Sequence, residues 1–214
     1  MTTQELTTGA LRLTVAVGEL EAFLELPTDE VRFVALVCHP NPLQGGTFDN
    51  KVVTSLARSC RRAGGAALRF NFRGVGASDG VHAGGLGEAD DADLLLDWLT
   101  TQFPGVPVWL AGFSFGAMVA TRTAAQRAAR GKPVNQLLLV APPVHFYTWP
   151  VLADCQCPVT LIQGDDDEVV PPDEVYAWAQ KQTPKPAIIR VAACGHFFHG
   201  RLGELARAAQ TTLP

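Results

Sequence analysis

The sequence lacks a long apolar run and a basic stripe, and each absence excludes a class of protein. No apolar run reaches the roughly 20 residues that a helix needs to cross a bilayer. The 17 lysines and arginines are scattered and the formal net charge is −4, so we expect neither a membrane nor a nucleic-acid partner. With 214 residues, 47% of them hydrophobic, the chain can bury a large core, and we expect a single domain over residues 1–214.

Paired cysteine spacings and a leader pattern are also missing. The five cysteines form no disulfide framework, and Cys155 and Cys157 do not have the C-x-x-C spacing of a redox or zinc motif. The N-terminal stretch MTTQELTTGALRL has no basic region followed by an apolar one, so we expect no secretory signal peptide. These features predict a cytoplasmic protein, and they predict no particular oligomeric state.

What is present is an alternation of strands and helices. Two alternating segments joined by Gly18-Glu19 predict an antiparallel hairpin over 11–17 and 20–26. Apolar runs predict buried strands at 33–38, 66–72, 108–110, 136–140, 159–163 and 187–192. Helices are expected at 49–62, 88–101, 117–129, 172–182 and 202–211. This order predicts an α/β fold, with a mostly parallel, doubly wound sheet, helices on both faces and an antiparallel N-terminal edge.

Serine is scarce, yet one of the four serines lies in a G-x-S-x-G motif. Ser114 is the centre of Gly112-Phe-Ser-Phe-Gly116, between an apolar strand and a helix of small residues. The glycines leave room for a turn so sharp that the hydroxyl projects above the sheet. The N–H of Phe115 would then face the oxygen that becomes negative when Ser114 attacks a carbonyl. The alternative is a strand–helix packing turn without chemistry.

A nucleophilic serine needs a base, and the base needs an acid to orient it. Among five histidines, His196 follows the last predicted strand and can reach over the sheet edge, with His199 as the second choice. The acid should lie between Ser114 and His196. The loop 164–171, GDDDEVVP, offers four acids there, of which Asp165 is typical of a turn.

Two further patterns favour structural roles. The glycine-rich loop 73–80 has its third glycine one position late for a dinucleotide fingerprint. The acids near residue 88 suit the first turn of a helix better than a metal site. We therefore expect neither a metal nor an organic cofactor.

Together, the motifs resemble those of the α/β-hydrolase superfamily, in particular its small, lidless bacterial members. Besides the serine motif, the resemblance rests on NFRGVGAS at 71–78, GDDDEVVP at 164–171 and GHFF at 195–198, and it covers nearly the whole chain. It implies an α/β-hydrolase fold without a cap domain. It also implies a catalytic triad of Ser114, Asp167 and His196.

The resemblance further implies a second oxyanion donor just after the strand at 33–38. Pro40 and Pro42 have no N–H there, which leaves Asn41 or Leu43, and Leu43 is preferred. The segment 141–158 is too short for a lid. We expect four residues beside the serine to bind substrate, namely His39, Phe146, Tyr147 and Trp149. The alternative for the aromatic residues is that they pack against the sheet edge.

The sequence thus predicts a serine hydrolase, carboxylesterase-like, that cleaves a small-molecule ester or thioester through an acyl-enzyme. A peptidase or amidase of the same fold is one alternative. A non-catalytic binding protein of this fold is another, which the loss of a triad residue would favour, but all three positions are occupied.

Overall fold

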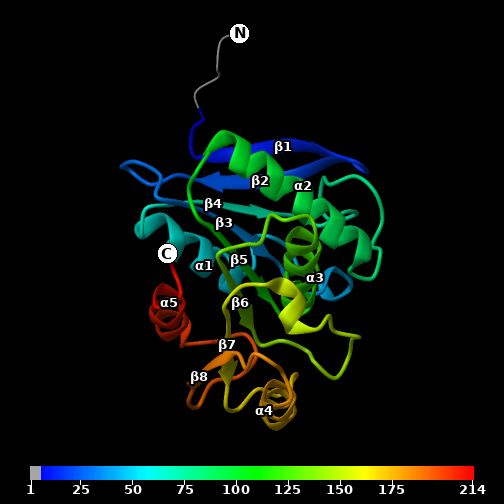
Figure 1. The fold of residues 1–214 in the computed structure, drawn as a ribbon, viewed down its shortest axis with the longest axis vertical. Coiled ribbons are helices and arrows are strands. Elements are labelled where there is room, and N and C mark those ends of the chain that lie inside the picture. Colours follow the sequence, from blue (N-terminus) through cyan, green and yellow to red (C-terminus); the bar gives the residue numbers. More distant parts are fainter. Residues whose placement is uncertain (1–5) are drawn as a thin grey trace.

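The computed structural model describes residues 6–214, and its centre is a sheet of eight strands (Figure 1). Residues 1–5, part of the stretch in which we expect no signal peptide, lie outside the described residues. The strands follow in the spatial order β1-β2-β4-β3-β5-β6-β7-β8. Their bounds are β1 Gly9–Val15, β2 Gly18–Glu25, β3 Phe33–Cys38, β4 Gly65–Phe70, β5 Val108–Phe113, β6 Gln136–Val140, β7 Val159–Gly164 and β8 Ala187–Val191.

The sheet is antiparallel only at its N-terminal edge. β1 pairs antiparallel with β2, and β2 with β4, whereas every pair from β4 to β8 is parallel. The strands β3, β4, β5 and β7 are buried at every residue, because helices cover both faces. The carboxyl ends of the parallel strands therefore meet at one edge, where loops from several strands gather.

Within residues 6–214, five α-helices cover the two faces of the sheet. Figure 1 shows α1 and α5 on one face and α2, α3 and α4 on the other, and each set packs on its own apolar cluster. Their bounds are α1 Lys51–Arg62, α2 Leu86–Gln102, α3 Phe115–Ala129, α4 Pro172–Gln180 and α5 Leu202–Gln210. Between β6 and β7 the chain forms one short 3₁₀ helix, Leu152–Cys155, and no cap domain. The predicted fold class is confirmed.

None of the described helices is long and apolar enough to span a membrane. The cytoplasmic location, the absence of a nucleic-acid partner and the single-domain organisation stay predictions.

The N-terminal hairpin is present, but its turn is not at Gly18-Glu19. Val15 pairs with Gly18, so Ala16 and Val17 form the two-residue turn. Gly18 begins β2 with a φ of 130°, and a Cβ there would collide with the side chain of Asp79. This glycine is needed for close approach of another loop rather than for the turn itself.

Two other boundaries differ for identifiable reasons. β4 ends at Phe70 rather than Phe72, because the N–H of Phe72 donates to His39 Nε2 instead of continuing the ladder. α1 begins at Lys51 rather than at residue 49, because the side chain of Asn50 caps the helix.

The acidic residues of α2 are engaged in structural contacts. Glu88 accepts hydrogen bonds from two backbone N–H groups that precede the helix. Arg73 donates two hydrogen bonds of 2.7 Å to Asp91, and Arg127 donates one of 2.8 Å to Asp93. Across residues 6–214, no three His, Cys, Asp or Glu side chains come together as a group that could hold a metal ion.

Candidate active site

Ser114 is the single residue between β5 and α3, at the carboxyl edge of the sheet. Its φ of 54° and ψ of −121° are strained for a residue with a side chain. A Cβ at Gly112 would collide with the carbonyl oxygen of Gly116, and a Cβ at Gly116 would collide with backbone at the end of β3. The two glycines therefore let the tight turn form and let β3 lie directly against it.

The side chains of Ser114, His196 and Asp167 form a hydrogen-bonded row. His196 Nε2 lies 3.1 Å from Ser114 Oγ, and His196 Nδ1 lies 2.9 Å from Asp167 Oδ2. Their exposed fractions are 9% for Ser114, 2% for His196 and 5% for Asp167. An ionised carboxylate only accepts, so Nδ1 carries the ring proton and Nε2 is free to accept the proton of Ser114. His199, the second choice, is exposed.

Asp167 is held by further donors. Its Oδ1 accepts the N–H groups of Val169 at 2.9 Å and Val170 at 2.7 Å, and its Oδ2 accepts from Gln163 Nε2 at 2.9 Å. These bonds satisfy both carboxylate oxygens and fix their direction toward His196. Gln163 was not predicted as part of the site. Its signal in the sequence is a long polar residue near the end of a strand that is fully buried.

The other three acids of this loop make different contacts. Asp165 accepts a hydrogen bond of 2.9 Å from Arg190, and Asp166 is exposed. Glu168 accepts the backbone N–H of His196 at 3.2 Å and so ties the histidine loop to the acid loop. Of the four, only Asp167 is buried.

Leu43 is not placed to be the second oxyanion donor. Its N–H donates to Asn41 Oδ1 at 2.9 Å, and the residue is 74% exposed. The preference for Leu43 is therefore wrong, because the side chain of Asn41 has captured that N–H in a local turn. Asn41 itself lines two cavities that open next to Ser114 and are described below. The other expected donor, Phe115, is the first residue of α3. Its N–H has no partner in a preceding helical turn.

His39 lines neither of the two cavities beside Ser114. It is fully buried, its Nδ1 lies 2.7 Å from the carbonyl oxygen of Pro40, and its Nε2 accepts the N–H of Phe72 at 3.0 Å. Since Nε2 is an acceptor, Nδ1 carries the proton and the ring is neutral. The expected substrate-binding role of His39 is therefore wrong, and the residue instead joins the loops that follow β3 and β4.

The burial of His39 predicts that the protein loses stability in mild acid. Burial lowers the pKa of His39 from 6.5 to about 4. Between these values the unfolded chain binds a proton that the folded chain does not, so the free energy of unfolding falls as pH decreases from 6.5 to 4. The full effect is about 3 kcal/mol. Denaturant titrations at several pH values in this range measure the free energy of unfolding. His39→Gln should show a shallower pH dependence than the wild type, and an unchanged slope would contradict the assignment.

Two cavities open beside Ser114. One has a volume of about 290 Å³ and is lined by Asn41, Gln44, Ser114, Phe115, Pro143, Phe146, Tyr147, Val169 and Val170. The other has a volume of about 320 Å³ and is lined by Pro40, Asn41, Gln44, Gly45, Gly46, Asn50, Ser114, Val169, His196 and Phe197. The first is bounded by aromatic side chains, and the second contains the histidine.

Of the three aromatic residues expected to line the pocket, Phe146 and Tyr147 lie against the first cavity. Trp149 does not. Its ring packs against Trp178 with centroids 5.3 Å apart, and its Nε1 donates to the carbonyl oxygen of Pro143. Trp149 therefore packs against α4 rather than lining this cavity.

Comparison with known proteins identifies relatives of the same fold, two of which are described as α/β serine hydrolases or their homologues. The family model described as "Serine aminopeptidase, S33" matches residues 45–150. A structure from Xanthomonas campestris, described as an α/β serine hydrolase without a lid, is 39% identical, with a TM-score of 0.88 over 97% of this chain and 94% of that one. An α/β serine hydrolase homologue from Coxiella burnetii is 37% identical, with a TM-score of 0.91 over 99% of this chain and 100% of that one. An uncharacterized protein of Rickettsia prowazekii is 35% identical, over 89% of this chain and 82% of its own length.

Proposed function

Because this chain belongs to the α/β-hydrolase superfamily, we propose that it cleaves small carboxylic esters or thioesters through an acyl-enzyme. One observation carries the proposal. Ser114 Oγ, the ring of His196 and the carboxylate of Asp167 are hydrogen-bonded in sequence at the border of two open cavities. A serine in such a row can lose its proton as it attacks a carbonyl carbon.

In the proposed reaction, Ser114 Oγ forms a bond to the carbonyl carbon while its proton passes to His196 Nε2. Asp167 stabilises the imidazolium through Nδ1. His196 then returns the proton to the leaving alcohol or thiol as the bond from the carbonyl carbon to that group breaks. Water attacks the acyl-enzyme by the same route and releases the acid. No step needs a metal or an organic cofactor.

Two backbone N–H groups are proposed to stabilise the tetrahedral oxyanion. Phe115 contributes one from the first turn of α3, where the helix dipole also favours negative charge. Asn41 contributes the other from the loop after β3, in place of Leu43. This assignment replaces the donor preferred from the sequence and keeps the same chemistry.

The two cavities are proposed to bind different halves of the substrate. His196 must reach the leaving group to protonate it, so the cavity that contains His196 takes the alcohol or thiol. The cavity lined by Phe146 and Tyr147 then takes the acyl group, and its apolar walls suit a short hydrocarbon chain.

A peptidase or amidase is the second candidate, and the matched family model favours it by its description. Esters and anilides of one acid separate the two. We expect the wild-type protein to react with a fluorophosphonate probe and to hydrolyse p-nitrophenyl butyrate. We expect kcat/KM for the matching p-nitroanilide to be lower by about a hundredfold or more, because an amine is the poorer leaving group. Comparable rates on both substrates would favour the amidase. A folded protein that neither labels nor turns over either substrate would support a non-catalytic role.

A further inference from the structure

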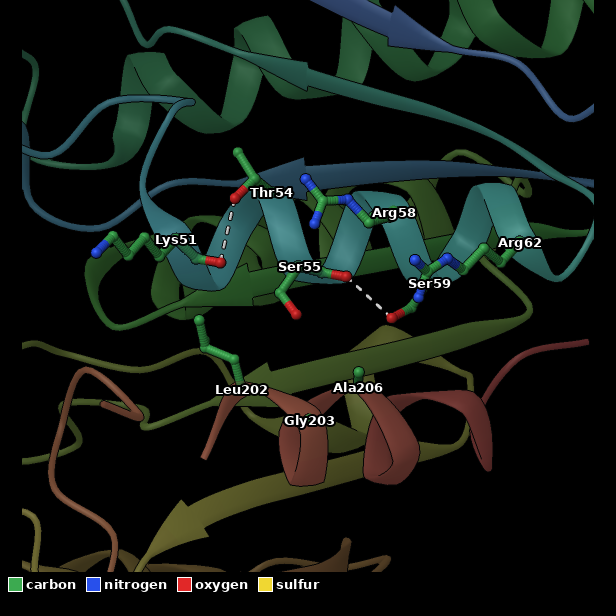
Figure 2. Close-up of a pocket in the computed structure, with 9 residues that line it drawn as sticks. All are labelled: Lys51, Thr54, Ser55, Arg58, Ser59, Arg62, Leu202, Gly203 and Ala206. Atoms are coloured by element: carbon green, nitrogen blue, oxygen red, sulfur yellow. Dashed lines mark hydrogen bonds between the residues drawn. The ribbon is translucent and has the colours of Figure 1, made fainter. Parts of the chain in front are cut away.

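A groove with a volume of about 380 Å³ lies between α1 and α5 (Figure 2), and its lining includes none of Ser114, His196 and Asp167. α1 lines it with three cationic side chains, Lys51, Arg58 and Arg62, and with three hydroxyl-bearing ones. α5 contributes only Leu202 and small residues. In Figure 2, Lys51 lies at one end of α1 and Arg62 at the other, and Ser55 points toward α5. Thr54 and Ser59 donate their hydroxyl protons to carbonyl oxygens within α1, so the groove is marked by its positive charge and by the hydroxyl of Ser55.

The three cations have no ion-pair partner within residues 6–214, although the chain as a whole has a net charge of −4. Their neighbour Arg61, by contrast, lies 3.6 Å from Glu25. A fourth cation comes from α5, since a Cβ at Gly203 in the groove would lie 3.7 Å from Arg207 Nη1. Like charges gathered without carboxylates create a positive potential that favours an anion.

One end of the groove is next in the chain to a residue of the active-site cavity. Asn50, directly before Lys51, lines the cavity that contains His196, and α5 begins shortly after the His196 loop. From Lys51 to Arg62 the helix rises about 16 Å. A ligand that leaves the His196 cavity along this groove would therefore pass three cations in succession.

We propose that the α1–α5 groove binds phosphate groups on the leaving group of the substrate. This inference rests on the proposed hydrolase function, in which the leaving group occupies the cavity that contains His196. Guanidinium, ammonium and hydroxyl donors are the groups that recognise phosphate oxygens. Cations spread over about 16 Å suit more than one phosphate. The substrate class is thus an acyl ester or thioester of a phosphorylated alcohol or thiol.

Two thioesters with the same acyl group and the same thiol arm test this. Acetyl-coenzyme A carries phosphates, and S-acetylpantetheine does not. We expect the wild type to favour acetyl-coenzyme A in kcat/KM by about ten- to a hundredfold, the range that charge-assisted hydrogen bonds supply. The double variant Arg58→Gln, Arg62→Gln should lose most of this preference and keep its rate on p-nitrophenyl acetate. Both residues are exposed on α1, and glutamine is a good helix former.

The control variant is Arg32→Gln, Lys181→Gln, which removes the same charge from exposed positions outside the groove and should keep the preference. Equal kcat/KM for the two thioesters in the wild type would overturn the proposal. The proposal would also be overturned if the groove variant kept the wild-type preference for acetyl-coenzyme A.

Titration with desulfo-coenzyme A measures binding to the groove without turnover. If it binds the wild type and not the groove variant while p-nitrophenyl acetate is not hydrolysed, the hydrolase function fails and the phosphate site stands. If desulfo-coenzyme A binds but the thioesters react equally, the groove is a site for a free anion and the leaving-group proposal is wrong.

Discussion

Replacing Ser114 with alanine is expected to lower kcat/KM for p-nitrophenyl butyrate by about 10⁴-fold or more. The substitution removes the oxygen that His196 Nε2 contacts at 3.1 Å, and with it the proposed acyl-enzyme. The strained turn is imposed by Gly112, Gly116 and the sheet, so alanine should fold into the same backbone. Steady-state assays give the rate, fluorophosphonate labelling should disappear, and the thermal unfolding temperature should stay close to that of the wild type.

A second serine provides the matched control. Ser78 is also buried, but its Oγ donates to the carbonyl oxygen of Asn71 and accepts the N–H of Glu21, far along the chain from the histidine loop. Ser78→Ala should cost about 1–2 kcal/mol of stability and leave labelling and turnover nearly intact. If Ser114→Ala kept more than about 1% of wild-type turnover, the nucleophile would have to be a different group.

The sheet could be predicted because its physical signals are local. β3 and β5 are apolar at nearly every position, which is typical of strands buried on both faces. Ser114 and its two glycines mark the tight turn by residue type alone. The hairpin turn was misplaced because Gly18 looks like a turn residue. A glycine is instead required there by the side chain of Asp79, which comes much later in the chain.

The errors in the site share one cause, since each depends on a hydrogen bond or a packing contact that the sequence does not show. His39 looked like a pocket residue, but the N–H of Phe72, in the loop after β4, donates a hydrogen bond to its ring. The N–H of Leu43 is captured by the side chain of Asn41. The basic residues are scattered in the sequence, yet the helical repeat and the packing of α5 gather Lys51, Arg58 and Arg62 along one groove.

Asp167→Asn is expected to lower kcat by about 10³- to 10⁴-fold while leaving the nucleophile in place. Oδ1 of Asp167 accepts the N–H groups of Val169 and Val170, so the amide oxygen of an asparagine will take that position. Its NH₂ group must then face His196 Nδ1 and Gln163 Nε2. A donor facing Nδ1 moves the ring proton to Nε2, and a protonated Nε2 cannot accept the proton of Ser114.

The same geometry predicts a cost in stability. Gln163 Nε2 is buried and would meet an NH₂ group instead of a carboxylate oxygen, which costs about 1–3 kcal/mol for an unsatisfied donor. Denaturant titration measures this term separately from kcat, so a slow but folded variant is distinguished from an unfolded one. Asp165→Asn is the control, because Asp165 contacts Arg190 and not the histidine. Its kcat should stay within about threefold of the wild type. If Asp167→Asn instead remained within tenfold of the wild type, Asp167 would not be the group that holds the ring, and Glu168, bonded to the backbone of His196, would be the next acid to replace.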